Sequence, residues 1–165
     1  EYAREKRQST SWIFKPHPML GLSCVKNGVF SSLEEYDAYC CAWDELPNAK
    51  VVTGEYLAYF ASSDAMILDS VSFMAEYLYT HKPSLFLTRE GAHFNEFGEM
   101  VFSVLYHAEG TDYASVEHFL DVLLESDPMR EARENFFRQV LDYADDHGKS
   151  ATQFIYDDIV HAIGV

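Results

Sequence analysis

Short apolar runs alternate with amphipathic segments through the first half of this chain. The runs suit buried strands, and the segments between them repeat apolar residues at the spacing of a helix. In chain order the pattern predicts strands over residues 12–15, 51–53, 65–68 and 84–87, and helices over residues 33–43, 55–61 and 73–81. Strands that alternate with helices need crossover connections, so we expect an α/β fold with one parallel sheet of four or more strands and helices on both faces.

The pattern becomes mainly helical from Phe94 onward. Ser115 is expected to cap one helix, and Asp127-Pro128 to open the next, because proline at the first helical position loses no hydrogen bond. Gly148 would end that helix, and Ser150 would cap a last one. No repeat or linker interrupts the pattern, so we expect residues 1–165 to form a single domain with a helical carboxyl-terminal layer.

Charge and composition narrow the choice of partners. The formal net charge is −15, yet residues 1–26 hold five bases against two acids, which leaves seven bases and twenty-five acids for the rest. Such an acidic surface repels a phosphate backbone, which argues against nucleic-acid binding, and a smaller anion is expected near Lys15. No apolar run approaches the roughly 18 residues that span a bilayer. The three cysteines form no disulfide framework or zinc spacing, which favours reduced thiols in a cytoplasmic protein.

The stretch DAMILDSVSFMAEYLYTHKPSLFL, residues 64–87, combines a strand, a polar turn, a helix and a second strand. Ligands of open parallel sheets bind at the carboxyl ends of strands, where this turn is expected. Ser70 and Ser72 would offer hydroxyls there and the following helix would offer N–H groups, which suits phosphate. Glu76 could accept hydrogen bonds from ribose hydroxyls. The structural alternatives are that Ser72 only caps the helix and that Glu76 is a solvated helical residue.

A second candidate is His17, which stands between Pro16 and Pro18 directly after the first predicted strand. The two prolines hold the backbone stiffly, so the imidazole is fixed where the chain leaves the sheet. An imidazole can donate to a phosphate oxygen or transfer a proton near neutral pH. If the first and third predicted strands belong to one sheet, His17 and Ser70 face one crevice. The alternative is that His17 only shapes a stiff turn.

Metal and cofactor motifs are missing from the sequence. The seven histidines show no H-E-x-x-H pair, and no G-x-G-x-x-G, P-loop or G-x-S-x-G is present. We therefore expect no cofactor and no metal site, with fixed donors of the protein replacing a divalent ion.

Several of these residues together carry a family resemblance. Lys15-Pro16-His17-Pro18, Asp69-Ser70-Val71-Ser72-Phe73, Glu76 and Lys82-Pro83 follow one another in the order found in one group of enzymes, and Gly148 to Ile159 looks like the end of the same domain. In these motifs the chain resembles the carboxyl-terminal, donor-nucleotide-binding domain of CDP-glycerol glycerophosphotransferases. These are GT-B transferases of teichoic-acid and capsule polysaccharide biosynthesis in the cell envelope.

The resemblance implies a Rossmann-like half of a GT-B fold that binds a CDP-linked donor. His17 would be the catalytic residue at the pyrophosphate. The substrate-binding residues would be Lys15, Asp69, Ser70, Ser72 and Glu76, with Glu76 at the ribose. The full enzyme would move glycerophosphate or a related polyol phosphate to a polymer or lipid-linked acceptor, bound by an amino-terminal domain that this stretch lacks. The fragment alone is expected to be inactive.

Two other functions stay open on the sequence. One is a GT-B relative with a sugar donor, either a glycosyltransferase or an enzyme like the UDP-sugar epimerases. The other is a non-catalytic acidic α/β module that binds a protein partner through its helices. For the transferase we expect a cytoplasmic location, with peripheral attachment at the inner face of the cell membrane, through the missing part, left open.

Overall fold

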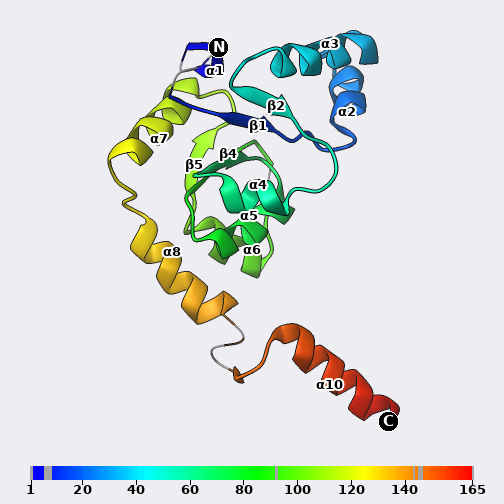
Figure 1. The fold of residues 1–165 in the computed structure, drawn as a ribbon, viewed down its shortest axis with the longest axis vertical. Coiled ribbons are helices and arrows are strands. Elements are labelled where there is room, and N and C mark those ends of the chain that lie inside the picture. The colour runs from blue at the N-terminus through cyan, green and yellow to red at the C-terminus, as the bar shows by residue number, and fades with distance from the viewer. Residues whose placement is uncertain (1, 6–8, 92, 143, 145–146, 165) are drawn as a thin grey trace. The chain divides into compact units, whose positions relative to one another are not determined.

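The computed structural model describes residues 2–5, 9–91, 93–142, 144 and 147–164 (Figure 1). It divides the chain into two compact units, Glu1–Ser62 and Ser63–Val165. We call these unit 1 and unit 2 and describe each by itself.

Unit 1 contains a small parallel sheet and four helices. Its elements are α1 (Tyr2–Glu5), β1 (Trp12–Phe14), α2 (Leu20–Lys26), α3 (Leu33–Asp44), β2 (Ala49–Val51) and α4 (Leu57–Ser62). Strand β1 pairs in parallel with β2, with Trp12 opposite Ala49. Phe14 stacks on Trp43 of α3, with ring centroids 5.4 Å apart. Aromatic packing of α3 on the strands thus forms much of this unit's interior.

The packing of α2 on α3 depends on a glycine. A Cβ atom added to Gly21 would lie 2.7 Å from the ring of Tyr36, so only glycine lets that ring approach the backbone of α2. The start of α3 is fixed by Ser32, whose side chain accepts from the N–H of Glu35. The carboxylate of Glu35 accepts in turn from the N–H of Ser31, at 2.7 Å. These reciprocal bonds satisfy two N–H groups at the start of the helix.

Unit 2 is built on a three-stranded parallel sheet with the order β3-β4-β5. Its elements are β3 (Met66–Leu68), α5 (Val71–Tyr77), η1 (Leu78–Thr80), β4 (Ser84–Thr88), α6 (Glu96–Phe102), β5 (Tyr106–Glu109), α7 (Tyr113–Glu125), α8 (Arg130–Phe136), η2 (Phe137–Leu141) and α10 (Ala151–Ile163). In the register, Leu68 lies opposite Phe86, and Thr88 lies opposite Glu109.

Both faces of this sheet are covered. Phe86 belongs to one buried cluster with Met74 of α5 and Val101 of α6. Its neighbour Leu85 belongs to a second cluster with Phe119 of α7. Because consecutive strand residues point to opposite faces, α5 and α6 cover one face and α7 covers the other. This layering holds the carboxyl ends of the three strands at one common edge.

The α/β class and the parallel pairing agree with the sequence-based expectation, but the single sheet of four or more strands was wrong. The strands form one sheet of two and one sheet of three, and β1 and β3 belong to different sheets. β1 and β2 are only three residues long, and β2 lies two residues earlier than the pattern predicted. Strands this short offer few ladder hydrogen bonds, so their apolar pattern does not specify which sheet they join.

The sequence analysis also missed three elements. Helices α2 and α6 each contain a glycine, which lowers helix propensity, and in α6 the side chain of Asn95 caps the N–H of Gly98 at 2.8 Å. Strand β5 alternates buried Ala108 with exposed His107 and Glu109, as expected of an edge strand. Glycines and polar edge positions weakened the signals on which the prediction relied.

The carboxyl-terminal helices correct two boundary predictions and confirm one. Asp112, rather than Ser115, caps α7, accepting from the N–H of Ser115 at 3.1 Å. The helix expected to run from Pro128 to Gly148 is α8 followed by η2 and ends at Leu141. Part of its predicted end, residues 143, 145 and 146, lies outside the described residues. Ser150 caps α10 as expected, accepting from the N–H of Gln153 at 3.2 Å.

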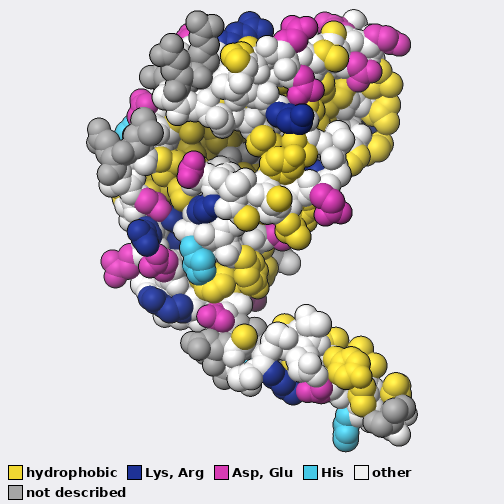
Figure 2. Space-filling model, in the orientation of Figure 1, with side chains coloured by type: hydrophobic (Ala, Val, Ile, Leu, Met, Phe, Trp, Pro, Cys, Tyr) yellow, Lys and Arg dark blue, Asp and Glu magenta, His cyan; other side chains and the backbone are white. Residues whose placement is uncertain are grey.

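The last helix is apolar and exposed. None of the residues of α10 is buried, and its exposed large hydrophobic side chains are Phe154, Ile155, Tyr156, Ile159 and Ile163. Figure 2 shows these hydrophobic side chains gathered along the segment near the carboxyl terminus. Among the described residues, no helix has both the length and the apolar character needed to cross a membrane.

Candidate functional site

The carboxyl ends of β1 and β2 bring Lys15 and His17 to one edge of unit 1. The two strands are parallel, and the N–H of Val52 still bonds to the carbonyl of Phe14 at 2.9 Å, so both chains leave the sheet together. Lys15 follows β1 directly, and His17 comes two residues later in an exposed turn. The sequence-based placement of these two side chains at a strand exit is therefore reproduced within unit 1.

The ring of His17 is oriented by the backbone that follows it. The N–H of Met19 donates to Nδ1 of His17 at 3.1 Å, and the N–H of Leu20 donates to its carbonyl at 2.8 Å. An accepting Nδ1 cannot carry a proton, so the neutral ring holds its proton on Nε2. The ring is exposed, which leaves the Nε2–H available to donate to a ligand oxygen.

The side chain of Lys15 is held by residues that follow β2. Its Nζ donates to the carbonyl of Gly54 at 3.0 Å and lies 5.3 Å from the ring centroid of Tyr56. An ammonium has three N–H donors, and these contacts occupy part of that capacity. Lys15 therefore adds a positioned positive charge at the edge that also carries His17.

In unit 2 the polar turn of residues 69–72, which we call the serine turn, lies at the carboxyl end of β3. Asp69 and Ser70 follow β3 directly, and Ser72 is the second residue of α5. Ser70 stands at the N-cap position with an extended backbone, yet its side chain makes no capping hydrogen bond. Neither serine hydroxyl has a hydrogen-bond partner among the described residues. The alternative in which Ser72 only caps the helix is therefore wrong, and both hydroxyls stay available to a ligand.

Glu76 and Asp69 are both exposed. Glu76 lies on α5, six residues after Ser70, and Asp69 lies between β3 and the serines. The ribose contact expected of Glu76 stays a prediction.

The six predicted site residues fall into two groups. Lys15 and His17 belong to unit 1, whereas Asp69, Ser70, Ser72 and Glu76 belong to unit 2. The expectation of one shared crevice assumed that β1 and β3 lie in one sheet, and they do not. The meeting of His17 with the serine turn therefore stays a prediction.

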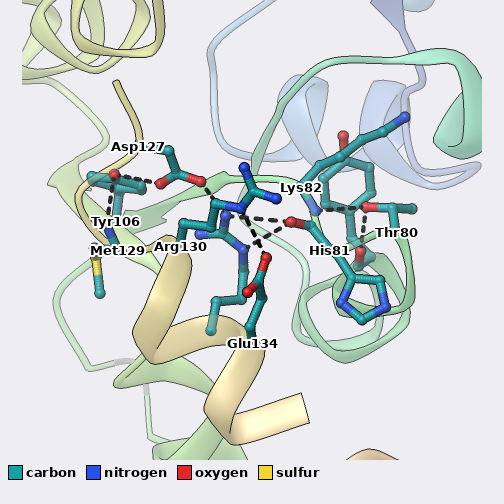
Figure 3. Close-up of polar contacts among 10 residues, drawn as sticks. Thr80, His81, Lys82, Tyr106, Asp127, Met129, Arg130 and Glu134 are labelled. Atoms are coloured by element: carbon teal, nitrogen blue, oxygen red, sulfur yellow. Dashed lines mark hydrogen bonds and ion pairs between the residues drawn. The ribbon is translucent and has the colours of Figure 1, made fainter. Parts of the chain in front are cut away.

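A buried ion pair in unit 2 was missed by the sequence analysis. Arg133 of α8 is 1% exposed, and its Nη2 donates to Asp127. Its Nε and Nη2 also donate to the carbonyl of His81, at 3.3 Å each. The hydroxyl of Tyr106 on β5 donates to Asp127 at 2.8 Å. Figure 3 shows Asp127 with Tyr106 on one side of this network and His81 on the other.

This network ties three elements of unit 2 together. It joins the start of α8 to β5 and to the turn between η1 and β4. Burial, followed by the hydrogen bond with Asp127, raises the pKa of Tyr106 above its ordinary value. The signal in the sequence was slight: Arg133 lies four residues after Met129 and three before Phe136, and therefore on the same helical face as these apolar residues. Buried arginines are rare, so the apolar pattern gave no reason to place this one inside.

A shallow cavity of about 340 Å³ lies beside this network. It is lined by His81, Glu134, Phe137, Arg138 and Asp142. His81 is the only described non-glycine residue with a positive φ, at 60°, and its ring packs 4.3 Å from that of Phe137. None of the sequence-predicted site residues lines this cavity, and its walls mix both signs of charge, so it does not define an anion site.

The described residues contain no group of three or more His, Cys, Asp or Glu side chains placed to hold a metal ion. The three cysteines are free thiols. Comparison with family models, curated proteins and solved structures finds no match to this chain.

Proposed function

We propose that this chain binds the nucleotide diphosphate of an activated donor, as the donor half of a transferase like the CDP-glycerol glycerophosphotransferases. In this proposal the chain corresponds to the donor half of a GT-B enzyme, and a further domain binds the acceptor. The group transferred is glycerophosphate or a related polyol phosphate from a CDP-linked donor.

One observation carries the proposal: His17, after β1, and Ser70, after β3, each have a hydrogen-bond donor that no described residue uses. The ring of His17 presents Nε2–H because its Nδ1 accepts from the backbone of Met19. Ser70 occupies an N-cap position without capping. A serine at that position normally bonds to the helix, so a free hydroxyl there favours a ligand with acceptor oxygens. Phosphate is the ligand whose oxygens match such a set of donors.

The proposed chemistry needs stabilisation of a leaving phosphate. In the transfer, an acceptor hydroxyl oxygen bonds to the transferred phosphorus and loses its proton to solvent, the bond from that phosphorus to the bridging oxygen breaks, and CMP leaves with the electron pair and the added negative charge. Protein donors would neutralise that charge as it develops: unit 1 offers the Nε2–H of His17 and the ammonium of Lys15, and unit 2 offers the serine hydroxyls. His17 acts as a neutral hydrogen-bond donor while Met19 holds its Nδ1. A second proton on the ring would break that bond.

Isothermal titration calorimetry with CDP, UDP and CMP tests the proposal. We expect saturable binding of both diphosphates by residues 1–165 and weaker binding of CMP, since the second phosphate supplies further acceptors. The double variant Ser70→Ala, Ser72→Ala should weaken CDP binding. Each hydroxyl contributes about the 1–3 kcal/mol of a lost charge-assisted hydrogen bond.

Ser23→Ala provides a control, because Ser23 is an exposed serine on α2 that belongs to neither set of proposed donors. It should bind CDP like the unchanged chain. Absence of saturable binding to both diphosphates would overturn the proposal and favour the non-catalytic module. Equal binding of CDP and UDP would keep the donor site but leave the sugar-donor enzymes as an equal choice.

A further inference from the structure

Arg89 stands apart from the other basic residues of unit 2. Unit 2 contains six lysines and arginines. Arg130 pairs with Glu134, Arg133 with Asp127, and Lys149 with Asp157. Arg138 bonds to Asn135, and Lys82 also has an interaction partner. Arg89 is exposed and makes no hydrogen bond or ion pair with any described residue.

The sheet register places Arg89 beside the serine turn. Leu68 of β3 lies opposite Phe86 of the central strand β4. Asp69 is the first residue after β3 and Arg89 the first after β4, so both chains leave the sheet at its carboxyl edge. Thr88 is still within the ladder, because its carbonyl accepts from the N–H of Gly110 at 3.1 Å. Arg89 is therefore the first residue beyond β4 at the edge that carries Ser70 and Ser72.

The charges at this edge are otherwise negative. The first three residues after each strand are Asp69, Ser70 and Val71 after β3, Arg89, Glu90 and Gly91 after β4, and Gly110, Thr111 and Asp112 after β5. Each of these three stretches contains one acid, and Arg89 is the only base among the nine residues. The hydrogen bonds that Asp112 accepts from Ser115 lower the pKa of its carboxyl, so that charge persists at neutral pH. A phosphate that approaches Ser70 meets these charges and needs a compensating cation.

We propose that Arg89 is the guanidinium that binds the donor phosphate at the serine turn, an inference that rests on the proposed function. A guanidinium presents paired N–H donors that match two oxygens of one phosphate, which an ammonium cannot do. Arg89 has all five donors available, whereas every other base of unit 2 is already engaged. Arg89 contributes affinity for the phosphate groups of the donor and does not recognise its base.

Titration of CDP and of cytidine into three chains tests this inference. Arg89→Ala should weaken CDP binding about tenfold or more, as expected for a lost charge-assisted contact, and should leave cytidine binding unchanged. Arg89→Lys should recover only part of the loss, because the paired geometry is gone. Arg138→Ala is the matched control: it removes the same charge from an exposed arginine on η2, so a general change of net charge acts equally in both variants.

The outcomes separate the two proposals. If the unchanged chain binds CDP and Arg89→Ala binds it equally well, the role of Arg89 is wrong and the donor site stands. If Arg89→Ala and Arg138→Ala weaken binding alike, the effect is one of net charge, which also overturns the inference. If the unchanged chain binds neither CDP nor UDP, the proposed function is wrong, and the role of Arg89, which depends on it, is wrong as well. Thermal unfolding of Arg89→Ala should match the unchanged chain, since the exposed side chain has no hydrogen bond or ion pair with the described residues to lose.

Discussion

At the scale of single residues, the two ring nitrogens of His17 can be tested separately. Its Nδ1 accepts from the N–H of Met19 at 3.1 Å and so shapes the entry to α2, while Nε2 faces solvent. A structural turn needs only the first nitrogen, and a donor site needs only the second. Substitutions that keep one nitrogen-like atom and remove the other can therefore distinguish a stiff turn from a functional residue.

His17→Asn and His17→Gln form such a pair. The Oδ1 of asparagine can replace Nδ1 as the acceptor, whereas the Nε2 of glutamine can replace the outer donor. In the proposed transferase, we expect His17→Asn to keep stability and lower turnover about a hundredfold. His17→Gln should keep more activity and lose stability. Turnover assays with matched urea titrations check both, and the opposite ranking would mean that His17 only shapes the turn.

Tyr36 is a residue whose ionisation should report the packing of α2 on α3. Burial, together with the thiols of Cys40 and Cys24, raises its pKa to about 12 from an ordinary value of 10.0. The folded chain thus keeps a proton that the unfolded chain releases above its lower pKa. The stabilisation is complete below pH 10 and is lost as the pH rises from 10 to 12.

Tyr36→Phe removes this ionisation and keeps the ring on Gly21. We expect the difference in unfolding free energy between the unchanged chain and the variant to be constant below pH 10. Between pH 10 and 12 the difference should shift against the unchanged chain. Urea titrations at several pH values measure it, and Tyr113→Phe, at an exposed tyrosine, is the control. A difference that stays constant up to pH 12 would contradict the burial of Tyr36.

At the scale of elements, the Arg133–Asp127 pair fastens α8 to the sheet of unit 2. Arg133→Met keeps the length of the side chain but leaves Asp127 and the carbonyl of His81 without these donors. Breaking one side of a buried pair costs about 3–5 kcal/mol of unfolding free energy. Asp127→Asn should cost a comparable amount, and the double variant should cost less than the sum. Urea unfolding of the three variants measures this coupling.

Arg130→Met is the control on the same helix. Arg130 lies in an exposed pair with Glu134, at 2.8 Å, and such pairs contribute little. Its substitution should cost only a small fraction of the loss at Arg133. Equal losses at the two positions, or additive losses at Arg133 and Asp127, would show that the buried network does not act as one unit.

These elements also show what the sequence could and could not predict. The apolar runs at β1, β3 and β4 and the cap of α10 were visible because each has a strong local signal. The serine turn could be placed after β3 because a polar turn must follow a buried strand. The division into two sheets depends on pairing between distant segments, which local patterns do not encode. Arg133 was missed, and the role proposed for Arg89 was not foreseen, because both depend on the neighbours that the fold supplies.

At the scale of the whole molecule, the net charge of −15 sets the conditions under which an anion can bind. Figure 2 shows acidic side chains at many places on the visible face, so a diphosphate approaches through a repulsive field. Local donors such as the Nε2–H of His17 act only at contact. The long-range field and the local contacts should therefore respond differently to salt. At 0.1 M salt the Debye length is about 10 Å, so salt screens the long-range repulsion much more than it screens contacts at hydrogen-bond distance.

This separation gives a kinetic prediction. Raising the salt from about 10 mM to about 150 mM should increase the association rate of CDP, since screening removes the repulsion that slows encounter. A binding site inside a basic patch would give the opposite trend, because salt then weakens steering. Stopped-flow measurements with a fluorescent CDP analogue check the sign, and uncharged cytidine, whose rate should not change, is the control. An association rate that falls with salt would mean that the basic residues dominate the approach and that the acidic surface lies away from the donor's path.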